Sequence, residues 1–220
     1  MNLPAVVSRD AWLAARKKLL IAEKQMTRAR DALNAERRRL PMVRIEKNYE
    51  FHGAQGMATL RDLFESRRQL IVYHMMAVGC PGCSLLVDNI GHLSHLHARD
   101  TTLVVVSRAP WPRLAAFWKR MQWVVPCFSS HGSDFNQDFQ VSPPASGEDF
   151  SNEASGVSVF LRDSDTLFHT YSTHDRGTDI LNGTLNYLDL TALGRQEDWE
   201  QPPGRANSSA SGWWCLHDEY

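Results

Sequence analysis

Two cysteines separated by two residues form the part of this sequence best suited to chemistry. Cys80 and Cys83 enclose Pro81-Gly82, directly after the apolar run 70–76. The run predicts a buried strand, and the segment behind the motif predicts a helix over 84–97. At such a junction the first sulfur lies near unpaired backbone amides and the positive end of the helix dipole, which favour a thiolate. The second cysteine follows one turn later, where it can attack a mixed disulfide formed on the first. The motif therefore predicts thiol–disulfide chemistry, with Cys80 as nucleophile and Cys83 as resolving thiol.

The same two cysteines could instead belong to a structural zinc site, which requires four suitably spaced ligands. The nearby candidates are three histidines, at His92, His95 and His97. If the helix behind the motif carries them, His92 lies roughly 14 Å beyond Cys83 along its axis, too far to share one ion. We therefore predict no metal and no tightly bound cofactor. A structural or vestigial cysteine pair stays open as an alternative.

The segments around the motif alternate between strand and helix patterns. The expected strands, which are apolar and rich in β-branched residues, cover 69–76, 101–107, 124–128, 156–162 and 167–171. The expected helices, which repeat apolar residues at helical spacing, cover 84–97, 111–121 and 178–189. A helix separates the first two strands, so we expect them to be parallel, whereas the last two form a hairpin. With a Cys-x-x-Cys motif behind the first strand, this order predicts a thioredoxin-like α/β fold, a three-layer α/β/α sandwich around a mixed sheet. The polar segment 129–155 is expected to be an exposed loop.

Three further residues are candidates for binding a substrate. Arg108 and Trp111 follow the second buried strand, at the sheet edge where open α/β folds bind their ligands. Arg108 could stabilise a thiolate or hold an anionic substrate, although an ordinary surface arginine is the competing interpretation. His169 could relay a proton to a leaving thiolate, although a structural histidine within a hairpin strand is the alternative. The two remaining cysteines, Cys127 and Cys215, are expected to be inert thiols.

A long helix precedes this α/β segment. Ser8 is suited to cap its start and Pro41 to end it, which gives a helix of about 30 residues. Every seventh residue is large and apolar, and we call this set the α-seam: Trp12, Leu19, Met26, Leu33 and Leu40. Alanines lie three residues after each of the first three members. A helix of this length is not held by propensity alone, so the α-seam should pack on the same domain or on a second copy of the chain. A homodimer through this helix is therefore expected as one possibility.

Composition limits the classes of function. The chain is 43% apolar and 22% charged with a formal net charge of −1, values ordinary for a soluble globular protein with no general attraction to nucleic acid or membranes. Charged residues interrupt the first twenty positions, where a signal peptide would be apolar, and no run approaches the roughly 20 apolar residues of a membrane helix. We therefore expect a cytoplasmic protein. Its expected parts are a helical extension (1–42), an α/β domain (43–195) and a polar tail (196–220), mobile until Trp213-Trp214 docks on the body.

Several segments together resemble an uncharacterised family of predicted thioredoxin-like proteins, related to the alkyl hydroperoxide reductase/thiol-specific antioxidant group. The segments that carry the resemblance are Gly79-Cys80-Pro81-Gly82-Cys83-Ser84, Val105-Val106-Ser107-Arg108-Ala109-Pro110, Gly132-Ser133-Asp134-Phe135-Asn136, Phe168-His169-Thr170-Tyr171-Ser172-Thr173 and His217-Asp218-Glu219-Tyr220. The likeness extends over nearly the whole chain. It implies a thioredoxin-like fold and a redox role for the two motif cysteines.

Two positions depart from the patterns of better-known relatives. Thioredoxins usually place a cis-proline before the strand that faces the redox motif, whereas this chain has Ser155-Gly156-Val157 there. Peroxiredoxins require Thr or Ser three residues before the reactive cysteine, and here Ala77 occupies that position. We therefore predict a thiol–disulfide oxidoreductase acting on protein or small-molecule disulfides and thiols. A non-catalytic dimeric binding or assembly protein and a thiol peroxidase are the alternatives.

Overall fold

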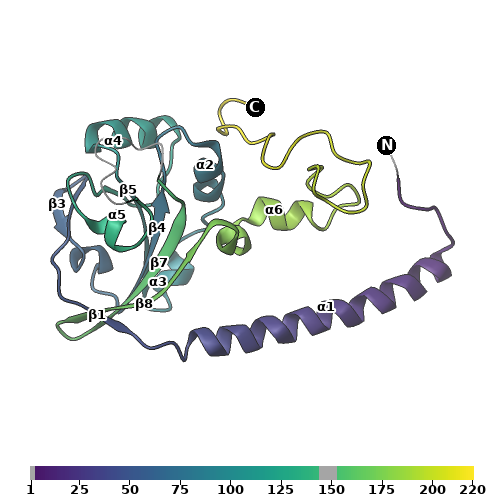
Figure 1. Ribbon diagram of the computed structural model, residues 1–220, viewed down its shortest axis with the longest axis horizontal. Helices are drawn as coiled ribbons and strands as arrows, with labels where there is room; N and C mark the ends of the chain where they lie inside the picture. The colour runs from purple at the N-terminus through teal and green to yellow at the C-terminus, as the bar shows by residue number, and fades with distance from the viewer. Residues whose placement is uncertain (1–2, 144–152) are drawn as a thin grey trace.

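The computed structural model describes residues 3–143 and 153–220, and its centre is a mixed sheet of eight strands (Figure 1). In chain order the strands are β1 (Val43–Ile45), β2 (Glu50–Gly53), β3 (Gly56–Thr59), β4 (Gln69–Met75), β5 (Thr101–Ser107), β6 (Cys127–Ser129), β7 (Gly156–Asp163) and β8 (Thr166–His174). Their order in the sheet is β1-β8-β7-β4-β5-β6-β2-β3. The strands β4, β5 and β6 run parallel to one another, and the remaining pairings are antiparallel.

The parallel pairing of β4 and β5 determines what lies near the cysteine motif. Met75 is opposite Ser107, so the two strands end at the same edge of the sheet. Both strands are buried on both faces, as expected for parallel strands covered by helices. The segments after β4 and β5, which carry Cys80 and Arg108, therefore leave the sheet side by side. The predicted parallel arrangement is confirmed.

Helices cover both faces of the sheet. They are α1 (Arg9–Arg37), α2 (Pro81–Asp88), α3 (Ser94–His97), α4 (Trp111–Arg120), α5 (Phe135–Asp138), α6 (Gly183–Leu188) and the 3-10 helices η1 (Asp62–Phe64) and η2 (Asp175–Leu181). Side chains of α2 and α4 share one core with Tyr73 and Val105, whereas those of η1 and α5 share the other with Val72 and Val104. Neighbouring strand residues point to opposite faces, so each strand contributes to both cores. The predicted three-layer α/β/α sandwich is confirmed.

The expected helix over 84–97 is divided in two, so that prediction was wrong. α2 begins earlier, at Pro81, and ends at Asp88. The side chain of Asn89 then donates to the Leu85 carbonyl and accepts from the Thr184 amide, which ties this end of α2 to α6. Gly91, a poor helix former, follows, and α3 starts at Ser94. The expected helix over 178–189 is likewise split into η2 and α6.

The segment 129–155 was predicted to be an exposed loop, and much of its described part is buried instead. It contains α5, whose Phe135 is fully buried against Phe51 and Phe160. Ser130 and Asn136 are also buried and hydrogen-bonded to each other. A high content of polar residues concealed this packing, because those side chains bond to one another rather than to water. Residues 144–152 of the predicted loop lie outside the described residues.

The long N-terminal helix is present, and Figure 1 shows it extending away from the sheet. Ser8 caps it as predicted, its hydroxyl accepting from the Ala11 amide at 3.3 Å. No residue of this fully described helix is buried, and the α-seam residues are 48–68% exposed. At the other end the Arg37 guanidinium lies 5.5 Å from the centre of the Tyr171 ring. Packing of the α-seam on its own domain, one of our two expectations, was therefore wrong.

The C-terminal tail is held against the body. Glu197 is buried, and its carboxylate accepts hydrogen bonds from the indoles of Trp199 and Trp213. Arg120 of α4 pairs with both Asp218 and Glu219. The hydrogen bonds to Glu197 gather the segment before the paired tryptophans around one buried carboxylate, and its expected mobility stays a prediction. The predicted docking of the tryptophans is confirmed. Over the described residues, no helix combines the length and the apolarity needed to cross a bilayer.

Candidate active site

The turn between β4 and α2 presents Cys80 at the start of the helix. Gly79 has φ +86, a left-handed conformation that glycine adopts without strain. Pro81 occupies the first helical position, where its missing amide hydrogen costs nothing. Cys80 is consequently the N-cap residue, and its sulfur accepts a hydrogen bond from the Cys83 amide at 3.3 Å. The local sequence thus aims one sulfur at the unpaired amides of the first turn, as predicted.

The pKa values of the two motif cysteines are shifted in opposite directions. A hydrogen bond from the Cys83 thiol lowers the pKa of Cys80 to about 6, helped by the backbone amides of Cys83 and Gly82 and opposed by burial. The pKa of Cys83 is raised well above its usual value by the same interaction and by its own burial. At neutral pH the pair therefore consists of a Cys80 thiolate and a protonated Cys83. This is the division of roles that a nucleophile and a resolving thiol require.

Tyr73 is a site residue that the sequence reasoning missed. Cys83 is only 2% exposed, and its sulfur receives a hydrogen bond from the Tyr73 hydroxyl. Burial raises the pKa of Tyr73, so the hydroxyl stays protonated. Its oxygen in turn accepts from the Ser155 hydroxyl at 3.2 Å. Ser155 stands just before β7, in the approach where thioredoxins usually have proline. Alternation along β4 places Tyr73 and Met75 on one face, a signal that could have indicated Tyr73.

A tryptophan from the C-terminal tail covers the middle of the motif. A Cβ atom on Gly82 would lie 2.7 Å from Cζ3 of Trp214, so the indole rests directly on the glycine backbone. The indole nitrogen of Trp214 is buried and lacks a hydrogen-bond partner among the described residues. Leu216, two residues on, belongs to the same core cluster as Cys83. Glycine at position 82 is thus required by the neighbouring ring.

Arg108 and Trp111 lie at the expected sheet edge, in different environments. The Arg108 guanidinium donates to the Glu153 carboxylate at 2.9 Å, and the two side chains are 12% and 1% exposed. The second oxygen of Glu153 accepts from Asn136 at 3.2 Å and from Ser142. Arg108 is therefore largely enclosed and ion-paired, unlike the ordinary surface arginine of the competing interpretation. Trp111 packs against the core cluster that contains Cys83 and thus borders the site.

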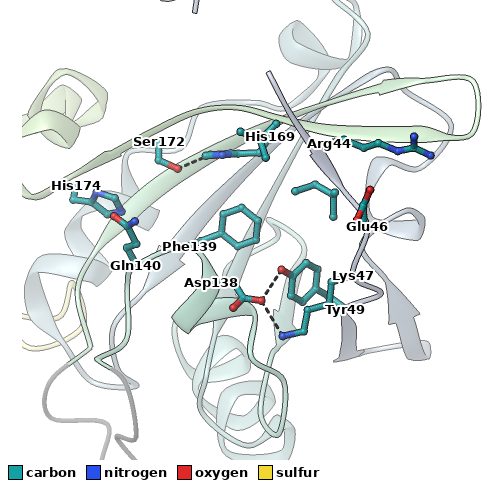
Figure 2. Close-up of a pocket in the computed structure, with 12 residues that line it drawn as sticks. Arg44, Glu46, Lys47, Tyr49, Asp138, Phe139, Gln140, His169, Ser172 and His174 are labelled. Carbon is teal, nitrogen blue, oxygen red and sulfur yellow. Dashed lines mark hydrogen bonds and ion pairs between the residues drawn. The ribbon is translucent and has the colours of Figure 1, made fainter. Parts of the chain in front are cut away.

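His169 is not brought to the cysteines. Its ring contacts Phe139 and Phe160, on the sheet face opposite the cluster that contains Cys83. His169 lines a separate pocket of about 500 Å3. Figure 2 shows its ring directed toward Ser172. Nε2 of His169 lies 2.8 Å from the Ser172 hydroxyl. Burial lowers the pKa of His169, which is the behaviour of the structural alternative.

The hydrogen bonds of His169 continue inward across the sheet. The Ser172 hydroxyl lies 2.9 Å from that of Ser158, which lies 2.9 Å from Nε2 of His74. These residues come from three adjacent strands, β8, β7 and β4. Burial lowers the pKa of His74 to about 3, so this fully buried ring is neutral. The chain of side chains links the pocket to the centre of the sheet on the face away from the cysteines.

Burial raises the pKa of Cys127 to about 12, as expected for an inert thiol. All four cysteines are free. Within residues 3–143 and 153–220, no group of three or more His, Cys, Asp or Glu side chains is arranged to hold a metal ion.

Comparison with solved structures shows which class this architecture belongs to. Peroxiredoxin 6 of Arenicola marina, solved as a cysteine-to-serine mutant, matches at a TM-score of 0.50 and 11% identity over 68% of this chain and 74% of that one. The bacterioferritin comigratory protein of Xanthomonas campestris matches at 0.45 and 14% over 63% and 90%. The peroxidoxin BcpB of Mycobacterium tuberculosis matches at 0.43 and 19% over 68% and 96%. At 11% identity the match with a TM-score of 0.50 concerns the fold alone, which is that of thioredoxin-like proteins.

The whole chain, residues 1–220, matches the profile of a family described as "Bacterial protein of unknown function (DUF899)". The chain belongs to that family, which agrees with the resemblance seen in the sequence. No curated protein matches it.

Proposed function

We propose that this chain is a thiol–disulfide oxidoreductase that works through Cys80 and Cys83. The Cys80 thiolate attacks one sulfur of a substrate disulfide, forming a mixed disulfide and releasing one substrate thiolate. Cys83 then attacks the Cys80 sulfur, releasing the second substrate thiolate and leaving a Cys80–Cys83 disulfide. The substrate gains two electrons, and its two thiolates take up one proton from Cys83 and one from water. An external dithiol reduces the protein again.

The observation that carries this proposal is that the pKa of Cys80 is lowered while the pKa of its neighbour Cys83 is raised. While Cys80 is a thiolate, its charge helps to hold the proton on Cys83. Formation of the mixed disulfide removes that charge, so the pKa of Cys83 falls at the moment when Cys83 must become the attacking thiolate. The Tyr73 hydroxyl then donates to the new thiolate. A reducing cytoplasm would keep such a cysteine pair in its dithiol form, and we propose that location.

The test is reduction of insulin by dithiothreitol in the presence of the protein. The expected result is a rate above the uncatalysed background that Cys80→Ser abolishes and Cys127→Ala leaves unchanged. Cys83→Ser should accumulate a mixed disulfide with insulin, detectable by mass spectrometry. A rate equal to background, or one that survives Cys80→Ser, would overturn the proposal. Oxidation of Cys80 by mild peroxide at a catalytic rate, without insulin reduction, would favour the thiol peroxidase instead.

We also propose that the chain self-associates through α1, because the exposed α-seam needs a partner. A helix of 29 residues is roughly 44 Å long. If a second copy covers one third of the lateral surface of this helix, roughly 600 Å2 is buried per copy. Two such helices bury about 1,200 Å2, which lies at the lower end of stable interfaces. The alternation of large residues with Ala15, Ala22 and Ala29 suits two copies, because the large side chains of one helix fit over the alanines of the other.

A further inference from the structure

A second cavity of about 500 Å3 lies on the same sheet face as the cysteines and is separate from the pocket in Figure 2. Its floor consists of side chains from the centre of the sheet: Ile71, Leu103, Val157 and Val159. Its walls come from α2, α3, η2 and the residues between them: Leu86, Ile90, Leu96, Ile180 and Leu181. We call this cavity the apolar groove. Such a volume with mostly aliphatic walls is typical of sites for small ligands.

The polar groups that line the apolar groove are neutral or basic, and they include the neutral side chains of Asn89, Tyr171 and Thr173. Its lining residues include Arg37, His92 and His95, and none of the described lining residues is an aspartate or glutamate. The Arg37 guanidinium donates to the neutral side chain of Asn34 and lies over the Tyr171 ring. Among the described residues it has no carboxylate partner. A cation beside an aliphatic cavity, with no acid to neutralise it, complements a ligand that has an apolar body and an anionic head.

We propose that the apolar groove binds an amphipathic anion, a straight-chain carboxylate of roughly ten to twelve carbons, which suits a cavity of this size. Its hydrocarbon chain lies against Val157 and Val159, and its carboxylate is directed to Arg37. Each additional methylene buried against these walls should raise the affinity about fourfold until the groove is full. Neither motif cysteine lines this cavity, although Tyr73, which contacts Cys83, does, so the proposal does not require the redox chemistry.

The test is calorimetric titration with octanoate, decanoate and dodecanoate, below their micellar concentrations. We expect a stepwise gain in affinity along this series. Dodecanol and dodecyltrimethylammonium, which have the same chain with a neutral and a cationic head, should bind at least tenfold more weakly than dodecanoate. Arg37→Ala should remove this preference for the anion and leave dodecanol binding unchanged.

Two variants locate the site. Val159→Trp fills the floor of the groove and should abolish binding, and Leu181→Trp, at a partly exposed wall position, should do the same if the first variant fails to fold. Val43→Trp is the matched control, because Val43 lines the pocket of Figure 2 instead. No binding by the native chain, equal binding of all three head groups, or loss of binding in the Val43 variant alone would each overturn the proposal. A different occupant would also overturn it. If the native chain is a dimer that excludes dodecanoate, and sedimentation shows that Val159→Trp dissociates it, then a second copy of the chain occupies the groove.

Discussion

The hydroxyl of Tyr73 donates a hydrogen bond to the sulfur of Cys83 beneath the first turn of α2. This contact joins β4, the strand before the motif, to Cys83, the buried cysteine of the motif. Because burial keeps the proton on Tyr73, its hydroxyl stays available as a donor to Cys83 while its oxygen accepts from Ser155, and the donation is strongest to a thiolate. The contact is therefore worth most in the second step of the proposed reaction.

Tyr73→Phe should slow the attack of Cys83 on the mixed disulfide. A hydrogen bond to a charged acceptor contributes about 1.5–3 kcal/mol, so the resolving step should slow by roughly 10- to 100-fold. Single-turnover mass spectrometry would detect the mixed disulfide as it accumulates. The exposed Tyr187→Phe is the control, and unchanged kinetics in both variants would contradict the assigned role.

The alkylation rate of Cys80 should rise with pH around a midpoint near 6. The folded protein lowers the pKa of this thiol to about 6, so the reactive thiolate predominates above that pH and is lost below it. In Cys83→Ala the largest cause of the shift is gone, and the midpoint should move upward. A native midpoint near 8.5, the value for free cysteine, would leave Cys80 without its proposed activation.

Gly82→Ala should displace the tryptophan that covers the motif. The new methyl group would lie 2.7 Å from the Trp214 ring, and crowding of this kind typically costs about 1–3 kcal/mol. We expect a lower Tm, altered tryptophan fluorescence and faster proteolysis of the tail. Gly91→Ala is the matched control, because a Cβ there meets no atom within 4 Å. Equal effects of the two substitutions would show that the indole is not held against the motif.

Substitution of the α-seam should dissociate the proposed dimer. The double variant Leu19→Glu, Met26→Glu puts two negative charges into the paired surface, and sedimentation should then report a monomer. Lys24→Glu changes the charge by the same two units on another side of α1 and should leave association intact. A native chain that sediments as a monomer at micromolar concentrations would refute the pairing.

Removing one partner of the buried ion pair should be more harmful than removing both. Glu153→Gln removes the carboxylate that pairs with the largely buried Arg108 guanidinium, and loss of one partner of such a pair costs up to about 3–5 kcal/mol. The double variant Arg108→Met, Glu153→Leu should recover part of that loss, because it leaves no unpaired charge from this pair, although Asn136 and Ser142 lose an acceptor. Urea unfolding would measure both, and additive losses would mean that the two residues act independently.

Local sequence patterns were sufficient to predict most of the fold and the position of the Cys80 sulfur. The apolar runs at 69–76 and 101–107 gave β4 and β5, and the motif behind β4 gave the position of Cys80 at a helix start. The rest of the site depends on contacts between distant segments. Glu153 meets Arg108 and Trp214 meets Gly82 only after the sheet has formed, and no spacing in the sequence encodes either contact. For His169 the strand was predicted but the face was not. Alternation along a strand tells which residues share a face, but which face that is depends on the register of the sheet.

The neutral histidine at the centre of the sheet has a consequence for behaviour in acid. His74 titrates near pH 3 when folded but near its ordinary value of 6.5 when unfolded, so the unfolded chain takes up the extra proton between these limits. Its contribution to stability is complete above pH 6.5 and declines by about 1.4 kcal/mol for each pH unit below it. Acidification should therefore loosen the hydrogen-bonded column that joins β4, β7 and β8 and unfold the protein from its middle strands.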